Sequence, residues 1–270
     1  MGRQFKTIEI VLKIKRLANK GLEKSKVLIE KGSKGFVNEL FPPSLVCLDC
    51  GKELRDKSQR HLAICDACQN HLPYRKGRHC KYCGAYIIES DESTCSDCKV
   101  TPPEFKEVLA PFENKGVVKR MLDDYKRSGM TYLYIYIARH MTNYFRTSNV
   151  TVDYVLYIPQ TRRQNLARGF DHLKLITKFF VKATGIPQIQ PLYKTKNVPE
   201  FRPGEDRVSR YENVYGVFSM LPEFDADILK DKSILVIDDI LNSGATENAC
   251  ARVLKENGAK SVTVLTFIRV

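Results

Sequence analysis

The sequence predicts an α/β fold with a mostly parallel, Rossmann-like sheet, preceded by a small cysteine-rich module. From Glu104 onward, short apolar runs alternate with stretches of helical periodicity, which is the pattern of a parallel sheet covered by helices. Ahead of that region, eight of the nine cysteines form four Cys-x-x-Cys pairs. We therefore divide the chain into an extension (residues 1–40), the cysteine-rich module (41–103) and the α/β domain (104–270).

The composition narrows the function classes. Of the 270 residues, 43% are hydrophobic, which is ample for a core, and no run of 18 apolar residues predicts a membrane span. The N-terminus lacks the apolar core of a secretory signal, so we expect a cytoplasmic protein. The net charge is +13, with +6 in residues 1–40, +1 in 41–103 and +6 in 104–270. This excess favours a polyanionic partner, either nucleic acid or a multiply phosphorylated substrate, although basic proteins often carry such charge without a specific partner.

Residues 1–40 are rich in lysine and predict one or two basic amphipathic helices ending near Gly32–Gly35. Their apolar positions recur at helical spacing, at Ile10, Val11, Ile14, Leu17 and Ala18. A poorly ordered extension, or a start codon assigned too far upstream, explains the same composition. Phe41-Pro42-Pro43 interrupts the helical pattern and begins the cysteine-rich module.

The four Cys-x-x-Cys knuckles predict two structural zinc sites, because each knuckle presents two thiolates on one side and tetrahedral Zn²⁺ needs four soft ligands. Intervals of 14 and 11 residues suit two ribbons, and they favour sequential pairing of the knuckles over a crossed one. Gly51 and Gly84 follow their knuckles directly, where a positive φ lets backbone amides bond the sulfurs. The predicted ligands are Cys47, Cys50, Cys65, Cys68, Cys80, Cys83, Cys95 and Cys98.

Two other interpretations of the cysteines are weaker. A disulfide framework is typical of secreted chains, and this N-terminus lacks a secretory signal. A redox pair would use only one of the four knuckles. His61, His71 and His79 lie among the cysteines, but four cysteines per site leave them no vacancy, so we expect them at the surface. Cys250, outside the module, is expected to be a buried structural thiol.

The α/β domain is predicted to contain alternating strands and helices, with ligands at the carboxyl edge of the sheet. A charged stretch at 194–212, with two prolines and Gly204, predicts a mobile loop with some helix. The predicted strands are 107–112, 154–158, 189–192, 216–219, 234–237 and 261–268. The predicted helices are 115–124, 132–145, one within 164–183, and 247–256.

The segment 233–246 carries the clearest chemical signal. A buried strand, Ile234–Ile237, ends in Asp238 and Asp239, and a turn of small residues (242–246) then opens a helix. Free backbone N–H groups at such a helix start form an anion site, while the two acids suit hydroxyl groups. A ligand with a phosphate on one side and hydroxyls on the other is a sugar phosphate. The plainer interpretation is an ordinary strand–turn–helix with surface aspartates.

This segment resembles the phosphoribosyl pyrophosphate (PRPP) loop of type I phosphoribosyltransferases, which is four hydrophobics, two acids, two hydrophobics and a Thr-Thr-Gly-x-Thr-like turn. The resemblance implies that Asp238 and Asp239 hold the ribose hydroxyls. It also implies that the loop holds the 5′-phosphate through Asn242, Ser243, Gly244, Ala245 and Thr246. Asn242 replaces the usual threonine.

Two further segments resemble the ComF family. Arg168, Gly169 and Phe170 match its Arg-Gly-Phe-Asn-Gln signature, whereas Asp171 and His172 replace the last two residues. The signature implies that Arg168 and Gly169 face the pyrophosphate, to which an arginine fork is suited, although a solvated basic loop has the same composition.

Lys126 and Gly129 match the Lys-(Tyr/Phe)-x-Gly element of the same family, with Arg127 replacing an aromatic residue, and the match implies that Lys126 faces the ligand phosphates. Arg207, Arg210 and Asn213 fit the family's flexible loop only loosely.

The layout over roughly residues 43–270 resembles the ComF proteins: a double zinc ribbon followed by a type I phosphoribosyltransferase domain. The resemblance implies a competence protein that supports uptake of single-stranded DNA. Its ligands would be PRPP with Mg²⁺ and two zinc ions, and its partners single-stranded DNA and proteins of the competence machinery. The alternative is an active phosphoribosyltransferase of nucleotide or base metabolism. The acceptor is not readable from the sequence.

Overall fold

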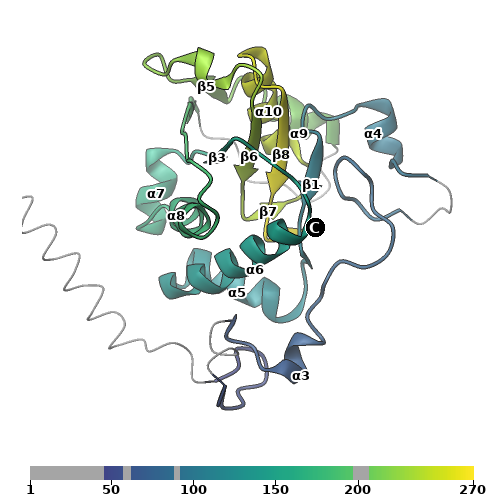
Figure 1. Cartoon of the computed structure of the whole chain (residues 1–270), viewed down its shortest axis with the longest axis vertical. Coiled ribbons are helices and arrows are strands. Elements are labelled where there is room, and N and C mark those ends of the chain that lie inside the picture. Colours follow the sequence, from purple (N-terminus) through teal and green to yellow (C-terminus); the bar gives the residue numbers. More distant parts are fainter. Residues whose placement is uncertain (1–45, 57–61, 88–91, 197–206) are drawn as a thin grey trace, which may run out of the picture. The chain divides into compact units, whose positions relative to one another are not determined.

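The computed structural model describes residues 46–56, 62–87, 92–196 and 207–270 (Figure 1). The helices predicted in residues 1–40 lie outside these ranges, as do His61 and positions 197–206 of the charged stretch. By its contacts the chain divides into two compact units, and the second, Ile64–Val270, contains all the sheets. No helix in the described ranges is long and apolar enough to cross a membrane.

A four-stranded parallel sheet forms the centre of the second unit, in the order β1-β8-β6-β3. Residues 234–237 of β6 are fully buried, as expected for a central strand covered on both faces. This sheet confirms the predicted α/β fold. Its strands are β1 (Glu107–Leu109), β3 (Tyr154–Tyr157), β6 (Ser233–Ile237) and β8 (Ser261–Leu265).

Helices form two groups around the sheet (Figure 1). In the first, α6 (Tyr134–Thr147) packs against α8 (His172–Thr184) and α5 (Gly116–Arg127), and α8 also contacts β3. In the second, α10 (Ala245–Glu256) packs against α9 (Arg207–Asn213) and β8. The first group therefore brings the ends of α5 and α8 toward the edge where β6 ends.

Two small sheets flank the central one. A parallel sheet in the order β2-β9-β7 joins Phe112–Glu113, Ile268–Arg269 and Ile240–Leu241. An antiparallel pair joins β4 (Leu192–Lys194) to β5 (Phe218–Met220). Short 3-10 helices, η1 (Thr131–Leu133) and η2 (Ala226–Leu229), complete the domain.

Several element boundaries differ from the predicted ones. The strand predicted at 107–112 is divided into β1 and β2, because Pro111 cannot donate to a ladder. The strand predicted at 261–268 is likewise divided into β8 and β9. The strand predicted at 189–192 begins only at Leu192, although the Ile189 N–H donates to the Val155 carbonyl at 3.0 Å.

The helix predicted within 164–183 is two helices, α7 (Arg162–Arg168) and α8. Gly169 ends α7 in the left-handed conformation, with φ +82°, and the Asp171 carboxylate caps α8 by accepting the Lys174 N–H at 3.1 Å.

Candidate functional site

Asp239 is a buried carboxylate at the carboxyl end of β6, with 3% of the residue exposed. Its two oxygens accept hydrogen bonds from Lys126 Nζ at 3.1 and 3.0 Å, and His172 Nε2 lies 2.5 Å from Oδ2. Burial alone would raise the pKa of Asp239, but Lys126 and His172 lower it well below the ordinary value. Asp239 is therefore ionised and holds the Lys126 and His172 side chains in place.

Arg168 extends this network from the end of α7. Its guanidinium lies within hydrogen-bond distance of His172 Nδ1, so Arg168, His172, Asp239 and Lys126 form one continuous chain of polar contacts. The Tyr125 hydroxyl donates to the His172 carbonyl at 2.7 Å and fixes the start of α8. Helices α5, α7 and α8 thus bring Lys126, Arg168 and His172 to the end of β6.

Asp238 differs from its neighbour because it is half-buried and lies beside another carboxyl group, that of Glu247 on α10. Burial and the charges of Asp239 and Glu247 raise the pKa of Asp238 well above its ordinary value. Burial likewise raises the pKa of Glu247 to about 7. Two carboxyl groups in contact share a proton more readily than they both ionise.

The turn after these acids opens helix α10. Gly244 is the N-cap of α10, with φ +79°, and has no side chain of its own to cap the helix, while Ser243 Oγ accepts the Ala245 N–H at 3.4 Å. The Phe105 ring would lie 3.3 Å from a Cβ at this position. N–H groups in the first turn of a helix have no intrahelical acceptor, and such groups bind anions.

Arg210 and Gly169, two further residues of the ComF resemblance, lie in different environments. Arg210, on α9, donates to Asn242 Oδ1 at 3.4 Å and so reaches the turn. Gly169 is exposed, and a Cβ there would meet nothing within 4 Å, so its glycine is explained by the left-handed end of α7. The Arg207 side chain lies outside the described part of the structure.

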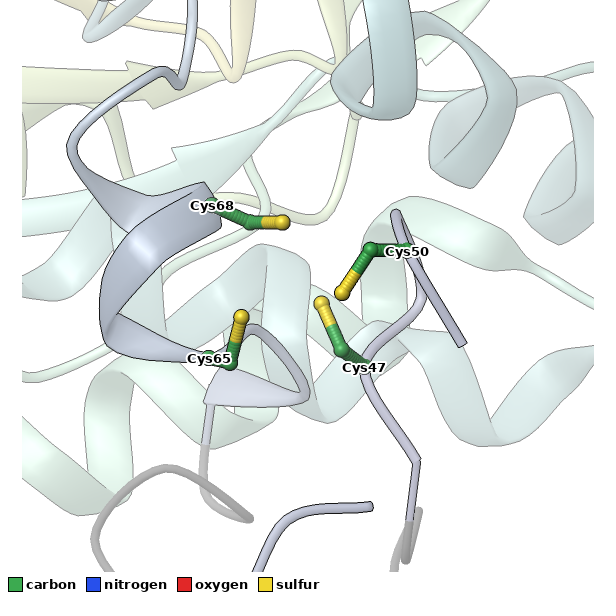
Figure 2. Close-up of side chains that lie close together, drawn as sticks. All are labelled: Cys47, Cys50, Cys65 and Cys68. Carbon is green, nitrogen blue, oxygen red and sulfur yellow. The ribbon is translucent and has the colours of Figure 1, made fainter. Parts of the chain in front are cut away.

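The eight predicted cysteine ligands fall into two four-cysteine clusters. Within each cluster the sulfurs lie within 4.8 Å of one another, and knuckles adjacent in sequence pair, as predicted. Figure 2 shows the four side chains of the first cluster turned toward a common centre. No disulfide joins any of the nine cysteines, all of which lie in the described ranges, and this is inconsistent with a disulfide framework. A set of four sulfurs at this spacing fits tetrahedral Zn²⁺. The clusters are Cys47, Cys50, Cys65 and Cys68, and Cys80, Cys83, Cys95 and Cys98.

Backbone geometry supports the cysteine clusters. Gly51 and Gly84 have φ values of +72° and +66°, and the Ala85 N–H lies 3.5 Å from Cys83 Sγ. Hydrogen bonding to Cys98 lowers the pKa of Cys83 to about 4, against burial, so the metal-binding thiolate is favoured. His71 is exposed, whereas His79 is half-buried and stacks edge-on against Tyr86.

The second cysteine cluster is attached to the sheet edge. Arg269, on β9, donates through Nε to the Cys83 carbonyl at 2.8 Å and through Nη1 to the Leu241 carbonyl at 3.4 Å. Arg75 donates from its backbone to the Pro111 carbonyl at 3.0 Å, and its side chain reaches the Gly84 carbonyl. Because Leu241 immediately precedes the 242–246 turn, one arginine links this cluster to the turn.

The family comparisons agree with these two kinds of site. A family model described as a double zinc ribbon domain matches residues 36–99, and one described as a phosphoribosyl transferase domain matches residues 203–270. The structure and these matches define a zinc-ribbon protein with a phosphoribosyltransferase domain.

Among curated proteins, Competence protein ComFC of Bacillus subtilis (strain 168) is 24% identical over 241 residues, which are 83% of this chain and 95% of that protein. Adenine phosphoribosyltransferase of Treponema denticola is 34% identical over 96 residues, which are 36% of this chain and 45% of that enzyme. The chain is a ComFC homologue that combines a double zinc ribbon with a phosphoribosyltransferase domain.

Two solved structures have similar parts. One is the glutamine PRPP amidotransferase from B. subtilis complexed with ADP and GMP, with 18% identity, a TM-score of 0.32, and 66% of this chain and 32% of that chain covered. The other, titled as the allosteric regulatory enzyme of purine biosynthesis, has 17% identity, a TM-score of 0.31, and 67% and 31% covered. The chain thus spans about a third of the length of each.

Sequence reasoning missed two residues of the site. The sequence analysis identifies His172 only as a departure from the ComF signature, yet His172 joins Arg168 to Asp239. Its position four residues after Arg168 is the sequence feature that could have indicated this contact. Glu247 was treated as the first residue of a helix, although it is 3% exposed and contacts Asp238. The position of an acid directly after the proposed phosphate-binding turn is the sequence feature that could have identified Glu247.

Proposed function

We propose that residues 238–246 bind PRPP, together with Mg²⁺. The ribose hydroxyls would be held by Asp238 and Asp239, and the 5′-phosphate by the backbone of 242–246. Lys126 and Arg168 would face the pyrophosphate. The observation that carries the proposal is the network in which Lys126 and His172 contact Asp239 and Arg168 contacts His172, beside the start of α10.

The same arrangement supports phosphoribosyl transfer. An acceptor would attack C1′ of the ribose, and the bond from C1′ to the pyrophosphate oxygen would break with its electron pair leaving on the pyrophosphate. Mg²⁺, when bound with PRPP, neutralises charge on the pyrophosphate oxygens. Asp239 positions Lys126 beside the leaving group, so this chain contributes orientation and fixed charge and forms no covalent bond to the sugar.

The competence role belongs to the same proposal. Similarity to Competence protein ComFC over 95% of that protein supports a ComF-like function in the uptake of single-stranded DNA, with competence-machinery proteins as partners. The net charge of +13 favours a polyanion such as DNA. Under this proposal the chain is organised as an extension (1–40), a double zinc ribbon (41–103) and a phosphoribosyltransferase domain (104–270).

An active phosphoribosyltransferase of nucleotide or base metabolism is the second candidate. The 34% identity to an adenine phosphoribosyltransferase over 96 residues favours it. The two candidates are compatible, because binding of PRPP is common to both.

Calorimetric titration with PRPP and Mg²⁺ tests the shared step. We expect the wild-type chain to bind PRPP and Asp239→Ala to bind at least about tenfold more weakly, since a lost charged contact is worth more than 1.4 kcal/mol. Glu223→Gln, an exposed acid remote from the network, is the matched control. Absence of binding to the wild-type chain would contradict the proposal.

A gel shift with single-stranded DNA at several salt concentrations tests the competence role. We expect a shift at low salt that weakens as salt increases, because phosphate contacts release counterions. No shift at low salt counts against DNA binding while leaving the PRPP titration unaffected.

A further inference from the structure

The second cysteine cluster includes a basic hairpin, which consists of residues 75–87. His79 is bridged to Tyr86 in antiparallel pairing. Beside this bridge, the Ile87 N–H donates to the Arg78 carbonyl at 3.0 Å. The hairpin contains four cations and no acidic residue. A surface with one sign of charge favours a partner of the opposite sign.

Three of the four cations of the basic hairpin are available to a ligand. Lys76, Arg78 and Lys81 are exposed. None of them forms an ion pair with a carboxylate in the described ranges. Arg75 differs, because it is half-buried and its guanidinium donates to the Gly84 carbonyl within the hairpin. Arg75 therefore supports the hairpin, and the other three cations face solvent.

Tyr86 is an aromatic side chain that the hairpin holds at the surface. The residue is 63% exposed, yet its ring packs edge-on against His79, with the ring centroids 5.9 Å apart. The ring also lies against Gly77, where a Cβ would be only 3.0 Å from Tyr86 Cε2. Gly77 has φ +89°, so both its backbone conformation and the Tyr86 ring require glycine. A ring that is already held in place loses little conformational entropy when a ligand stacks on it.

The exposed ring and the exposed cations lie together. Lys76 and Arg78 are the chain neighbours of Gly77, so a cation leaves the backbone on each side of the point that the Tyr86 ring contacts. A single strand of nucleic acid has the complementary groups, because its phosphates pair with cations and its unpaired bases stack on aromatic rings. Neighbouring bases cover the base faces in a duplex, and an acidic protein matches the cations but not the ring.

We propose that the basic hairpin binds single-stranded DNA, with a base stacked on Tyr86 and phosphates paired with Lys76, Arg78 and Lys81. The inference rests on the proposed competence role, which it deepens by naming the surface that binds the strand. The hairpin shares no residue with the 238–246 segment or with the network around Asp239. Variants of the hairpin surface therefore test DNA binding separately from PRPP binding.

Fluorescence anisotropy of the zinc-loaded full chain with a labelled thymidine strand of about 20 nucleotides tests the stacking. We expect Tyr86→Ala to weaken binding of the strand about fivefold or more, and to change binding of the matching duplex less than about twofold. Tyr86→Phe should keep the affinity of the wild-type chain, because stacking uses the ring and not the hydroxyl. Tyr215→Ala, which removes an aromatic residue that is 67% exposed in the phosphoribosyltransferase domain, is the matched control.

The salt dependence of the same binding tests the cations. We expect the double variant Lys76→Gln and Arg78→Gln to lower the slope of log affinity against log salt by about 1.4, at about 0.7 for each lost phosphate contact. The calorimetric titration with PRPP should be unchanged. The control is the double variant Lys178→Gln and Lys182→Gln, which removes two exposed cations of α8 and should leave the slope as it is. The zinc content of each variant shows whether its cysteine clusters are intact.

Unchanged affinity for the single strand in both Tyr86→Ala and the double variant of the hairpin would overturn the inference and leave DNA binding by the chain in place. If the wild-type chain does not bind the strand at low salt, the competence role itself is refuted. Polyglutamate that displaces the strand at an equal concentration of charge would indicate an acidic protein as the partner, and this result would also overturn the inference.

Discussion

Asp239 is the residue at which the charges of the site meet. A buried carboxylate is costly without partners, and Asp239 has two, Lys126 and His172, which come from positions more than 60 residues away in sequence. Asp238, by contrast, is half-buried, and its pKa is raised by burial and by the charges of Asp239 and Glu247. The two adjacent acids therefore have different tasks: Asp239 positions Lys126 and His172, and Asp238 is the more open to a ligand.

Substitution of His172 tests this network. We expect His172→Ala to lower the stability by about 1–3 kcal/mol, because it leaves the buried Asp239 short of a donor. His172→Gln, which restores the residue of the ComF signature, keeps a donor and should cost less. Thermal unfolding followed by circular dichroism measures both, and His71→Ala, an exposed histidine, is the control. Equal losses for the two variants would contradict a donor role.

Glu247 makes stability depend on pH. Its pKa is raised to about 7 in the folded chain, so the folded state holds a proton that the unfolded state releases at a pH near 4.5. The free energy of unfolding contributed by this group is therefore highest below pH 4.5 and falls as the pH rises toward 7.

We expect Glu247→Gln, which cannot ionise, to reduce that fall by about 1–3 kcal/mol, given 1.4 kcal/mol per pKa unit. Urea unfolding of both chains at pH 5 and pH 8 measures the difference, which includes the coupled titration of Asp238, and titrating groups away from this pair cancel in the comparison. A Glu247→Gln chain with the same pH dependence as the wild type would show that Glu247 does not titrate in this range.

At the scale of elements, the turn that links β6 to α10 sets the geometry of the phosphate site. Gly244 adopts a left-handed conformation there, and the Phe105 ring occupies the space where a side chain would begin. The glycine is thus needed for two reasons, its backbone conformation and the close approach of Phe105.

Comparison of Gly244→Ala with Gly185→Ala separates the effect of the left-handed backbone from the effect of the close approach of Phe105. Gly185 has a similar φ of +77° at the end of α8, but a Cβ there meets nothing within 4 Å. We expect Gly185→Ala to cost the backbone strain alone, about 1–2 kcal/mol, and to leave PRPP binding intact. Gly244→Ala should cost more and weaken PRPP binding, as measured by urea unfolding and calorimetry. Equal effects on stability and no effect on binding would argue against this role of the turn.

The sequence was sufficient to predict the segment from β6 through the turn to α10, and with it the parallel sheet. In this segment the strand, the acids, the turn and the helix are contiguous, and each has a local signature. It was not sufficient for the elements that close the site. Lys126, Arg168 and His172 reach Asp239 only because α5, α6 and α8 pack together, and that packing depends on long-range contacts. The split of 164–183 into two helices was missed because Gly169 and Asp171 act as caps, a function that helical periodicity does not reveal.

At the scale of the whole molecule, the second cysteine cluster is part of the phosphoribosyltransferase domain's edge. Tyr74 bridges to Phe112 in an antiparallel pair, and their rings lie 4.8 Å apart. Arg269 then connects Cys83 to Leu241. We therefore expect metal binding at this cluster to be coupled to the turn that follows Leu241.

Arg269→Met tests this coupling. Because the variant removes the donors to both carbonyls, we expect zinc to be lost to a chelator more quickly and PRPP to bind more weakly, by about threefold to tenfold for one lost charged hydrogen bond. Zinc release is followed with a colorimetric chelator, and Lys260→Met, an exposed cation after α10, is the control. Unchanged zinc release and unchanged PRPP affinity would mean that the cluster and the turn are independent.

A crystal structure of the chain with PRPP and Mg²⁺ tests the central claim most directly. The account predicts the 5′-phosphate against the N–H groups of 243–246, the ribose hydroxyls at Asp238 and Asp239, and the pyrophosphate facing Lys126 and Arg168. PRPP bound elsewhere on the chain, or oriented with its pyrophosphate on the 243–246 turn, would contradict it.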